Sequence, residues 1–153
     1  AQDASKILNI PVATTTDRAS AVAEADVIVT TTPATEPILQ ADWLRPGQHI
    51  TAMGSDQPGK AELDPICLAR ADQYVADRLS QTRVMGELRH AIDAGVIDPH
   101  RDFSELGEVL IGKAVGRNDD DDITIADLTG TGGQDTAIAT HALAVIGQTG
   151  KAK

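Results

Sequence analysis

The chain has 153 residues, the size of one ordinary domain, and is long enough to enclose a hydrophobic core. Its formal net charge of −10 argues against nucleic acid or an anionic membrane as a partner. A single cysteine excludes an internal disulfide, and the sequence has neither a long apolar run nor the features of a signal peptide, so we expect a cytoplasmic protein with no membrane span.

The first part of the chain has the pattern of helices alternating with short strands. Residues 1–8 have the pattern of the end of a helix, and residues 10–13 have that of a short strand. Thr16 or Asp17 can cap a short helix that follows. The β-branched run at 27–31 then predicts a strand that is buried on both faces.

The middle of the chain continues this alternation. Strands are predicted at 49–53 and 73–76, and a helix between them at 66–69. The longest amphipathic pattern runs over 84–92 and predicts a helix that ends at Gly95, because glycine readily adopts the left-handed conformation that follows a helix.

The last part contains a linker candidate at 96–103 and an acidic run at 119–122. That run lacks the spaced ligands, glycine and terminal glutamate of a calcium loop, so we interpret it as a solvated loop. A strand is predicted at 123–127, then a glycine-rich turn and a helix at about 134–146. Because this helix is apolar around most of its circumference, we expect it to be buried or packed against another chain.

Strands that alternate with helices predict an α/β fold with a doubly wound parallel sheet. Ligands of such sheets bind beyond the carboxyl ends of the strands. Three of these ends are rich in threonine and small residues, namely 30–33, 53–56 and 127–130. They could be ordinary strand-ending turns, but three in one short sheet favour a ligand crevice.

Other patterns carry less information. The complete glycine fingerprint of dinucleotide-binding domains is absent, and the glycines at 130–133 form either a phosphate grip or a flexible turn. Asp56, which precedes Gln-Pro-Gly, could by spacing alone be a turn residue. The four histidines share no ligand spacing, so we expect no metal site, and Cys67 has the context of a buried structural thiol.

Several segments resemble a known family. Residues 25–33 resemble its fourth nucleotide-domain strand, and the loop at 54–63 is similar to its Gly-Asp-x-Pro-Gly-Lys-x-Glu-Leu segment. The match spans roughly residues 1–147 and identifies the ornithine cyclodeaminase and mu-crystallin family. Residues 127–137 look most similar to its ectoine-utilisation cyclodeaminase subgroup, which is similar to iminosuccinate reductases.

The resemblance implies a partial Rossmann-type fold that lacks its first strand, its glycine-loop helix and its second strand. Residues 1–130 would form the carboxyl-terminal part of an NAD(P)-binding domain. Residues 131–153 would form a helix that returns toward a substrate and dimerisation domain outside this chain. The implied partners are therefore a missing amino-terminal half, or further copies in a homo-oligomer, and a small amino-acid or imino-acid substrate.

The resemblance also implies roles for single residues. Asp56 matches the catalytic acid/base, a role that a pKa raised toward neutral would suit. Thr129 and Gly130 would contact the substrate. The cofactor, NAD or NADP, would be contacted by Thr31, Thr32, Met53, Gly54, Ser55, Lys60 and Leu128. The family's cyclodeaminases usually have Ser-Val at 128–129, and Leu-Thr there argues against ornithine as the substrate.

The implied chemistry is hydride transfer between the cofactor and an amino-acid α-carbon, with Asp56 moving a proton. A cyclodeaminase step and the reduction of an imino acid both fit this description. The alternatives are a mu-crystallin-like protein that binds a nucleotide or ligand without turnover, and a fragment that is inactive without its amino-terminal half.

Overall fold

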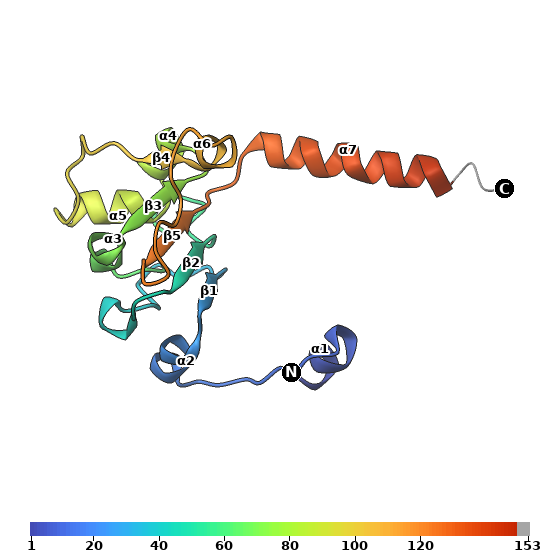
Figure 1. Cartoon of the computed structure of the whole chain (residues 1–153), viewed down its shortest axis with the longest axis horizontal. Helices are drawn as coiled ribbons and strands as arrows, with labels where there is room; N and C mark the ends of the chain where they lie inside the picture. Colours follow the sequence, from blue (N-terminus) through green and yellow to red (C-terminus); the bar gives the residue numbers. More distant parts are fainter. Residues whose placement is uncertain (150–153) are drawn as a thin grey trace.

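The computed structural model describes residues 1–149 and contains a five-stranded sheet in the order β1-β2-β5-β3-β4, with every neighbouring pair parallel (Figure 1). The strands are β1 Val27–Thr30, β2 His49–Ala52, β3 Gln73–Ala76, β4 Ser104–Glu105 and β5 Thr124–Asp127. This arrangement confirms the predicted α/β fold with a parallel sheet.

The two faces of the sheet differ in cover. On one face, Ile50 of β2 and Ile125 of β5 are paired in register and almost fully buried. On the other face, Val27 and Val29 of β1 are 60% and 56% exposed. The prediction that β1 is buried on both faces is therefore wrong for this chain, because no described element covers β1 on that side.

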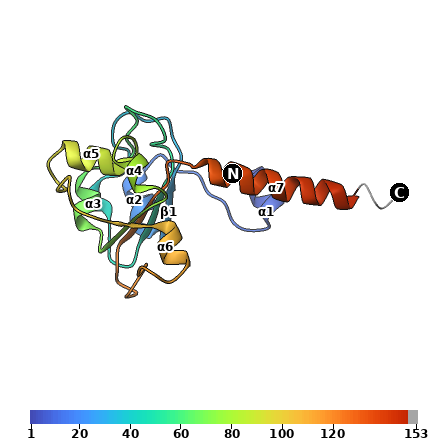
Figure 2. The ribbon, with the colours of Figure 1, turned by 90° about the horizontal axis from the view of Figure 1, so that it is seen from above.

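The helices lie mainly over the buried face, and α6 lies on the opposite face (Figure 2). The side chain of Asp17 accepts a hydrogen bond from the Ser20 amide, which confirms it as the cap of α2. Cys67 is fully buried, as predicted. The helices are α1 Gln2–Leu8, α2 Arg18–Glu24, the 3₁₀ helix η1 Ala41–Trp43, α3 Ile66–Arg70, α4 Leu79–Thr82, α5 Glu87–Asp93, α6 Leu106–Leu110 and α7 Gly132–Thr149.

Two predicted elements are wrong in detail. Residues 10–13 form no strand, because no described segment lies beside them to complete a ladder; the Val12 amide instead donates to the Ser5 hydroxyl. The helix predicted from Val84 begins only at Glu87, because Gly86 adopts a φ of 87° that interrupts the helix. It ends as predicted before Gly95, whose φ is 70°.

The long helix α7 projects away from the sheet (Figure 1). Ile138 and Leu143 on it are 64% and 71% exposed, so the predicted burial of this helix is not found within the chain. Its packing against another chain stays a prediction, and residues 150–153 of the predicted carboxyl-terminal segment lie outside the described residues. Within residues 1–149, no helix is both long and apolar enough to cross a membrane.

Candidate functional site at the carboxyl ends of the strands

A hollow of about 400 Å³ lies where β1 and β2 end. Two loops form its walls, one after each strand, and the parallel pairing of the strands brings these loops side by side. Its lining consists of Thr31, Thr32, Pro33, Met53, Gly54, Asp56 and Lys60. Most residues that the sequence predicted for the cofactor and for catalysis therefore meet at one place.

The charged pair at this hollow is formed by Asp56 and Lys60. The Lys60 ammonium nitrogen lies 2.6 Å from Asp56 Oδ1, and the side chains of Lys60 and Asp56 are 23% and 45% exposed respectively. The hydrogen bond from Lys60 is the main cause that lowers the pKa of Asp56. The raised pKa that would suit an acid/base role is therefore not found in this chain, because the carboxylate is solvated and paired with a cation.

Two of the predicted cofactor residues lie beside the hollow and do not line it. Ser55 is buried, and its hydroxyl donates to the carbonyl oxygen of Lys60 at 2.6 Å, which braces the loop. The Leu128 amide donates to the Ala52 carbonyl at 2.8 Å, so Leu128 starts its loop next to the end of β2.

The two residues predicted to contact substrate are bound to the end of β3. The hydroxyl of Thr129 donates to Asp77 Oδ1 at 3.1 Å, and the amide of Gly130 donates to Asp77 Oδ2 at 2.7 Å. Thr129 is also buried. The structure therefore does not bring these residues into the hollow with Asp56.

Three buried carboxylates were missed by the sequence reasoning, because glutamate and aspartate are seldom fully buried. Glu62, Glu87 and Asp127 are each at most 1% exposed. The Glu87 carboxylate accepts hydrogen bonds from the amides of Glu62 and Leu63. Asp127 accepts hydrogen bonds from the Tyr74 hydroxyl and from the first two amides of α5. The only signal for them in the sequence was the position of Glu62 in the family loop and of Asp127 at a strand end.

Burial raises the pKa of both Glu87 and Asp127 to about 7. An acid whose pKa is raised by folding binds more protons when folded than when unfolded, so its contribution to stability is complete below the unfolded pKa and is lost as pH rises through the folded one.

We therefore expect the free energy of unfolding to fall as pH rises from about 4 to about 7, with each group contributing up to about 1.4 kcal/mol per pH unit. Urea unfolding across this range measures the slope. Glu87→Gln should flatten the profile, whereas Glu108→Gln on the exposed surface should leave it unchanged. Equal slopes for wild type and Glu87→Gln would contradict the raised pKa of Glu87.

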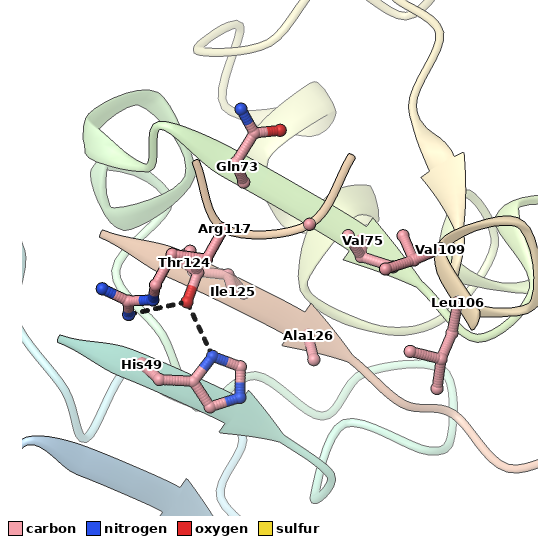
Figure 3. Close-up of a pocket in the computed structure, with 10 residues that line it drawn as sticks. His49, Gln73, Val75, Leu106, Val109, Arg117, Thr124, Ile125 and Ala126 are labelled. Atoms are coloured by element: carbon pink, nitrogen blue, oxygen red, sulfur yellow. Dashed lines mark hydrogen bonds between the residues drawn. The ribbon is translucent and has the colours of Figure 1, made fainter. Parts of the chain in front are cut away.

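A second hollow, of about 220 Å³, lies on the sheet face that carries α6 (Figure 3). His49, Gln73 and Thr124 line it, and they are the first residues of their strands. Arg117 and His49 both hydrogen-bond to the Thr124 hydroxyl, and burial, with Arg117 nearby, lowers the pKa of His49. This hollow therefore lies on the face of the sheet, between α6 and the first residues of three strands, and shares no lining residue with the hollow around Asp56. Within residues 1–149, no cluster of His, Cys, Asp and Glu side chains has the geometry to hold a metal ion.

Comparison with known proteins agrees with this fold. An uncharacterized cyclodeaminase from Sinorhizobium fredii is 63% identical over 126 residues, which are 82% of this chain and 38% of the relative. The iminosuccinate reductase of Paracoccus denitrificans, solved in complex with NAD⁺, superposes with a TM-score of 0.87 at 38% identity, covering 97% of this chain and 45% of that one. An archaeal alanine dehydrogenase dimer with bound NAD superposes with a TM-score of 0.81 at 38% identity, covering 90% of this chain and 42% of that one.

The chain spans less than half the length of these relatives. The model of one protein family, that of ornithine cyclodeaminase and mu-crystallin, matches residues 1–146, which is nearly the whole chain. Together with the parallel sheet and the loop at 54–63, this match shows that the chain belongs to the ornithine cyclodeaminase/mu-crystallin family.

Proposed function

We propose that this chain forms the carboxyl-terminal half of a nicotinamide-dependent enzyme that reduces an imino acid to an amino acid. In this proposal, residues 1–130 belong to the NAD(P)-binding domain, and residues 131–153 lead toward a substrate and dimerisation domain. The observation that carries the proposal is the hollow at the ends of β1 and β2, in a chain that superposes on an iminosuccinate reductase bound to NAD⁺.

The hollow fits one nucleoside half of such a cofactor. Gly54 contributes backbone to its wall, and Thr31 and Thr32 carry hydroxyl groups that can bind a ribose or a carboxamide. Met53 offers an apolar contact at the same wall. When bound, the cofactor supplies or accepts the hydride. The residues of this chain orient its reactive ring and exclude water from one side.

Asp56 is the proposed acid/base. Its side chain lines the hollow and is 45% exposed, so it can exchange a proton with a substrate nitrogen. Lys60 keeps Asp56 ionised in this chain, and covering the pair with substrate would raise the pKa of Asp56 by removing water from it.

Reduction is preferred to cyclodeamination because the chain superposes on an iminosuccinate reductase with a TM-score of 0.87. Leu-Thr at 128–129, where the family's cyclodeaminases usually have Ser-Val, also argues against ornithine as the substrate. The test uses the protein at its natural length, with any sequence that precedes this chain. NADH or NADPH is mixed with a panel of imino acids, and nucleotide oxidation and amino-acid product are measured together.

Stoichiometric oxidation of the nucleotide supports the reductase. Ammonia release from a diamino acid, without net nucleotide oxidation, would show a cyclodeaminase. Tight nucleotide binding without turnover would favour the ligand-binding alternative, and the absence of nucleotide binding would contradict the whole proposal.

A further inference from the structure

The buried carboxylate of Glu62 joins the two loops that form the hollow. Glu62 is completely inaccessible to solvent, and both of its carboxylate oxygens accept hydrogen bonds from protein groups. Oε1 accepts from the amide and the hydroxyl of Thr32, at 2.5 and 2.8 Å, and Oε2 accepts from the amide of Gly54 at 2.8 Å. The three donors belong to two residues that line the hollow, Thr32 in the loop after β1 and Gly54 in the loop after β2.

The contact between Glu62 and Gly54 leaves no room for a side chain. A Cβ atom at residue 54 would overlap both the Glu62 carboxylate and the carbonyl oxygen of Thr32. Backbone hydrogen bonds from Met53 to Thr30 and from Ala61 to Ala34 also join the loops after β1 and β2. At Thr32 and Gly54, where the loops line the hollow, the Glu62 carboxyl group lies between them in close contact with the Gly54 backbone.

Glu62 is itself fixed by a second buried carboxylate. Glu87, at the start of α5, accepts hydrogen bonds from the amides of Glu62 and Leu63 at 3.0 and 3.1 Å. Asp127, the last residue of β5, in turn accepts a hydrogen bond from the Glu87 amide at 2.9 Å. The ends of β1, β2 and β5 are thus connected through three buried carboxylates, and Glu62 is the member that reaches the hollow.

Burying a carboxylate is costly, and an apolar side chain of similar size fills the same space at lower cost. An apolar side chain at residue 62 would fill the space but would leave the Thr32 and Gly54 donors without their acceptor, which is itself costly. A carboxylate is needed to bind three donors on two separate loops at once, because a glutamine would present an amide group to one of them.

We propose that Glu62 is a positioning residue for the cofactor hollow: by binding Thr32 and Gly54 together, it fixes the width of the hollow and the orientation of its walls. This inference rests on the proposed nicotinamide-binding function. It assigns to Glu62 no contact with the reacting atoms.

The test is Glu62→Gln in the protein at its natural length. The amide oxygen can keep the bonds to Thr32, but the amide nitrogen then faces the N–H of Gly54, so the link from Thr32 through residue 62 to Gly54 is lost. We expect hydrogen exchange at the Gly54 amide to increase about tenfold or more in the free protein, and the Kd for NADH to rise by a similar factor. The KM for NADH should rise with it, whereas kcat should change less.

Gln48→Glu is the matched control. Gln48 is equally buried and also makes three hydrogen bonds to backbone groups, but it lies immediately before β2, at the opposite end of that strand. The Gln48→Glu variant replaces an amide group with a carboxylate, which is the reverse of the change in Glu62→Gln. We expect Gln48→Glu to lower stability without changing the Kd for NADH of the folded protein.

Thr32 provides a second pair of variants for the case in which Glu62→Gln does not fold. Thr32→Val removes the hydroxyl bond to Glu62 and should increase hydrogen exchange at the Gly54 amide, whereas Thr32→Ser retains the bond and should leave that exchange unchanged. Two results would overturn the inference: unchanged exchange at Gly54, or an unchanged Kd in a Glu62→Gln protein that binds NADH.

If the wild-type protein binds no nicotinamide nucleotide, the proposed function fails, and the inferred role in cofactor binding fails with it. Hydrogen exchange at Gly54 still decides separately whether Glu62 holds the two loops together. The failure of the function and the failure of the positioning role are therefore distinguishable.

Discussion

Replacing Asp56 with asparagine should lower kcat of the proposed enzyme by about 10²- to 10⁴-fold, the usual contribution of a general acid or base. The asparagine side chain has nearly the same shape as that of aspartate, but its amide group does not act as an acid or base near neutral pH. The side chain is 45% exposed and its ion pair with Lys60 is at the surface, so stability should change by less than about 1 kcal/mol. Steady-state kinetics with saturating NADH measure the effect.

The chain offers a close control in Asp93. Asp93 forms an i,i+4 ion pair with Arg89 at 3.0 Å, just as Asp56 does with Lys60, but it lies on α5 away from the lining of the hollow. Asp93→Asn should therefore leave kcat unchanged. Full turnover by Asp56→Asn would rule out the acid/base assignment, and equal losses in both variants would show a general effect of removing a surface ion pair.

Gly54→Ala should disrupt both the fold around the hollow and the binding of cofactor. The new methyl group would overlap the Glu62 carboxylate and the Thr32 carbonyl oxygen, so the two loops would have to separate. We expect a loss of about 3 kcal/mol in the free energy of unfolding, and a Kd for NADH raised at least tenfold. Urea unfolding and a fluorescence titration with NADH measure these quantities.

Gly107→Ala provides the comparison. A Cβ atom at Gly107 would meet no other atom within 4 Å, and the residue lies in α6, where alanine favours the helix. This variant should be neutral or slightly more stable and should bind NADH normally. If Gly54→Ala behaves like Gly107→Ala, the close contact with Glu62 does not control the shape of the hollow.

The parallel sheet was predictable because its central strands have strong local patterns. His49–Ala52 and Thr124–Asp127 are β-branched and apolar runs bounded by turn residues, and both form strands close to where the pattern places them. The short pair of β4 and α6 was missed because two and five residues are too few to show a periodic pattern. Residues 10–13 have the composition of a strand, but a strand also needs a neighbour, which a local pattern does not supply.

The site was predictable only in part. The rule that ligands bind beyond the carboxyl ends of parallel strands, together with the family loop, indicated the hollow around Asp56 and Lys60. This rule about strand ends does not predict which side chains point into the hollow and which are bound elsewhere. Thr129 is bound to Asp77, and Glu62 is buried between two loops, because of tertiary contacts over long sequence separations.

The outer edge of β1 has a practical consequence for anyone who produces this chain. Within residues 1–149, β1 pairs only with β2, and Val27 and Val29 are exposed beside its open edge. Unpaired backbone groups next to β-branched side chains act as a template for strands from other molecules. When produced alone at high concentration, the chain should therefore be prone to aggregate through this edge, and a lysine at residue 29 should improve its solubility.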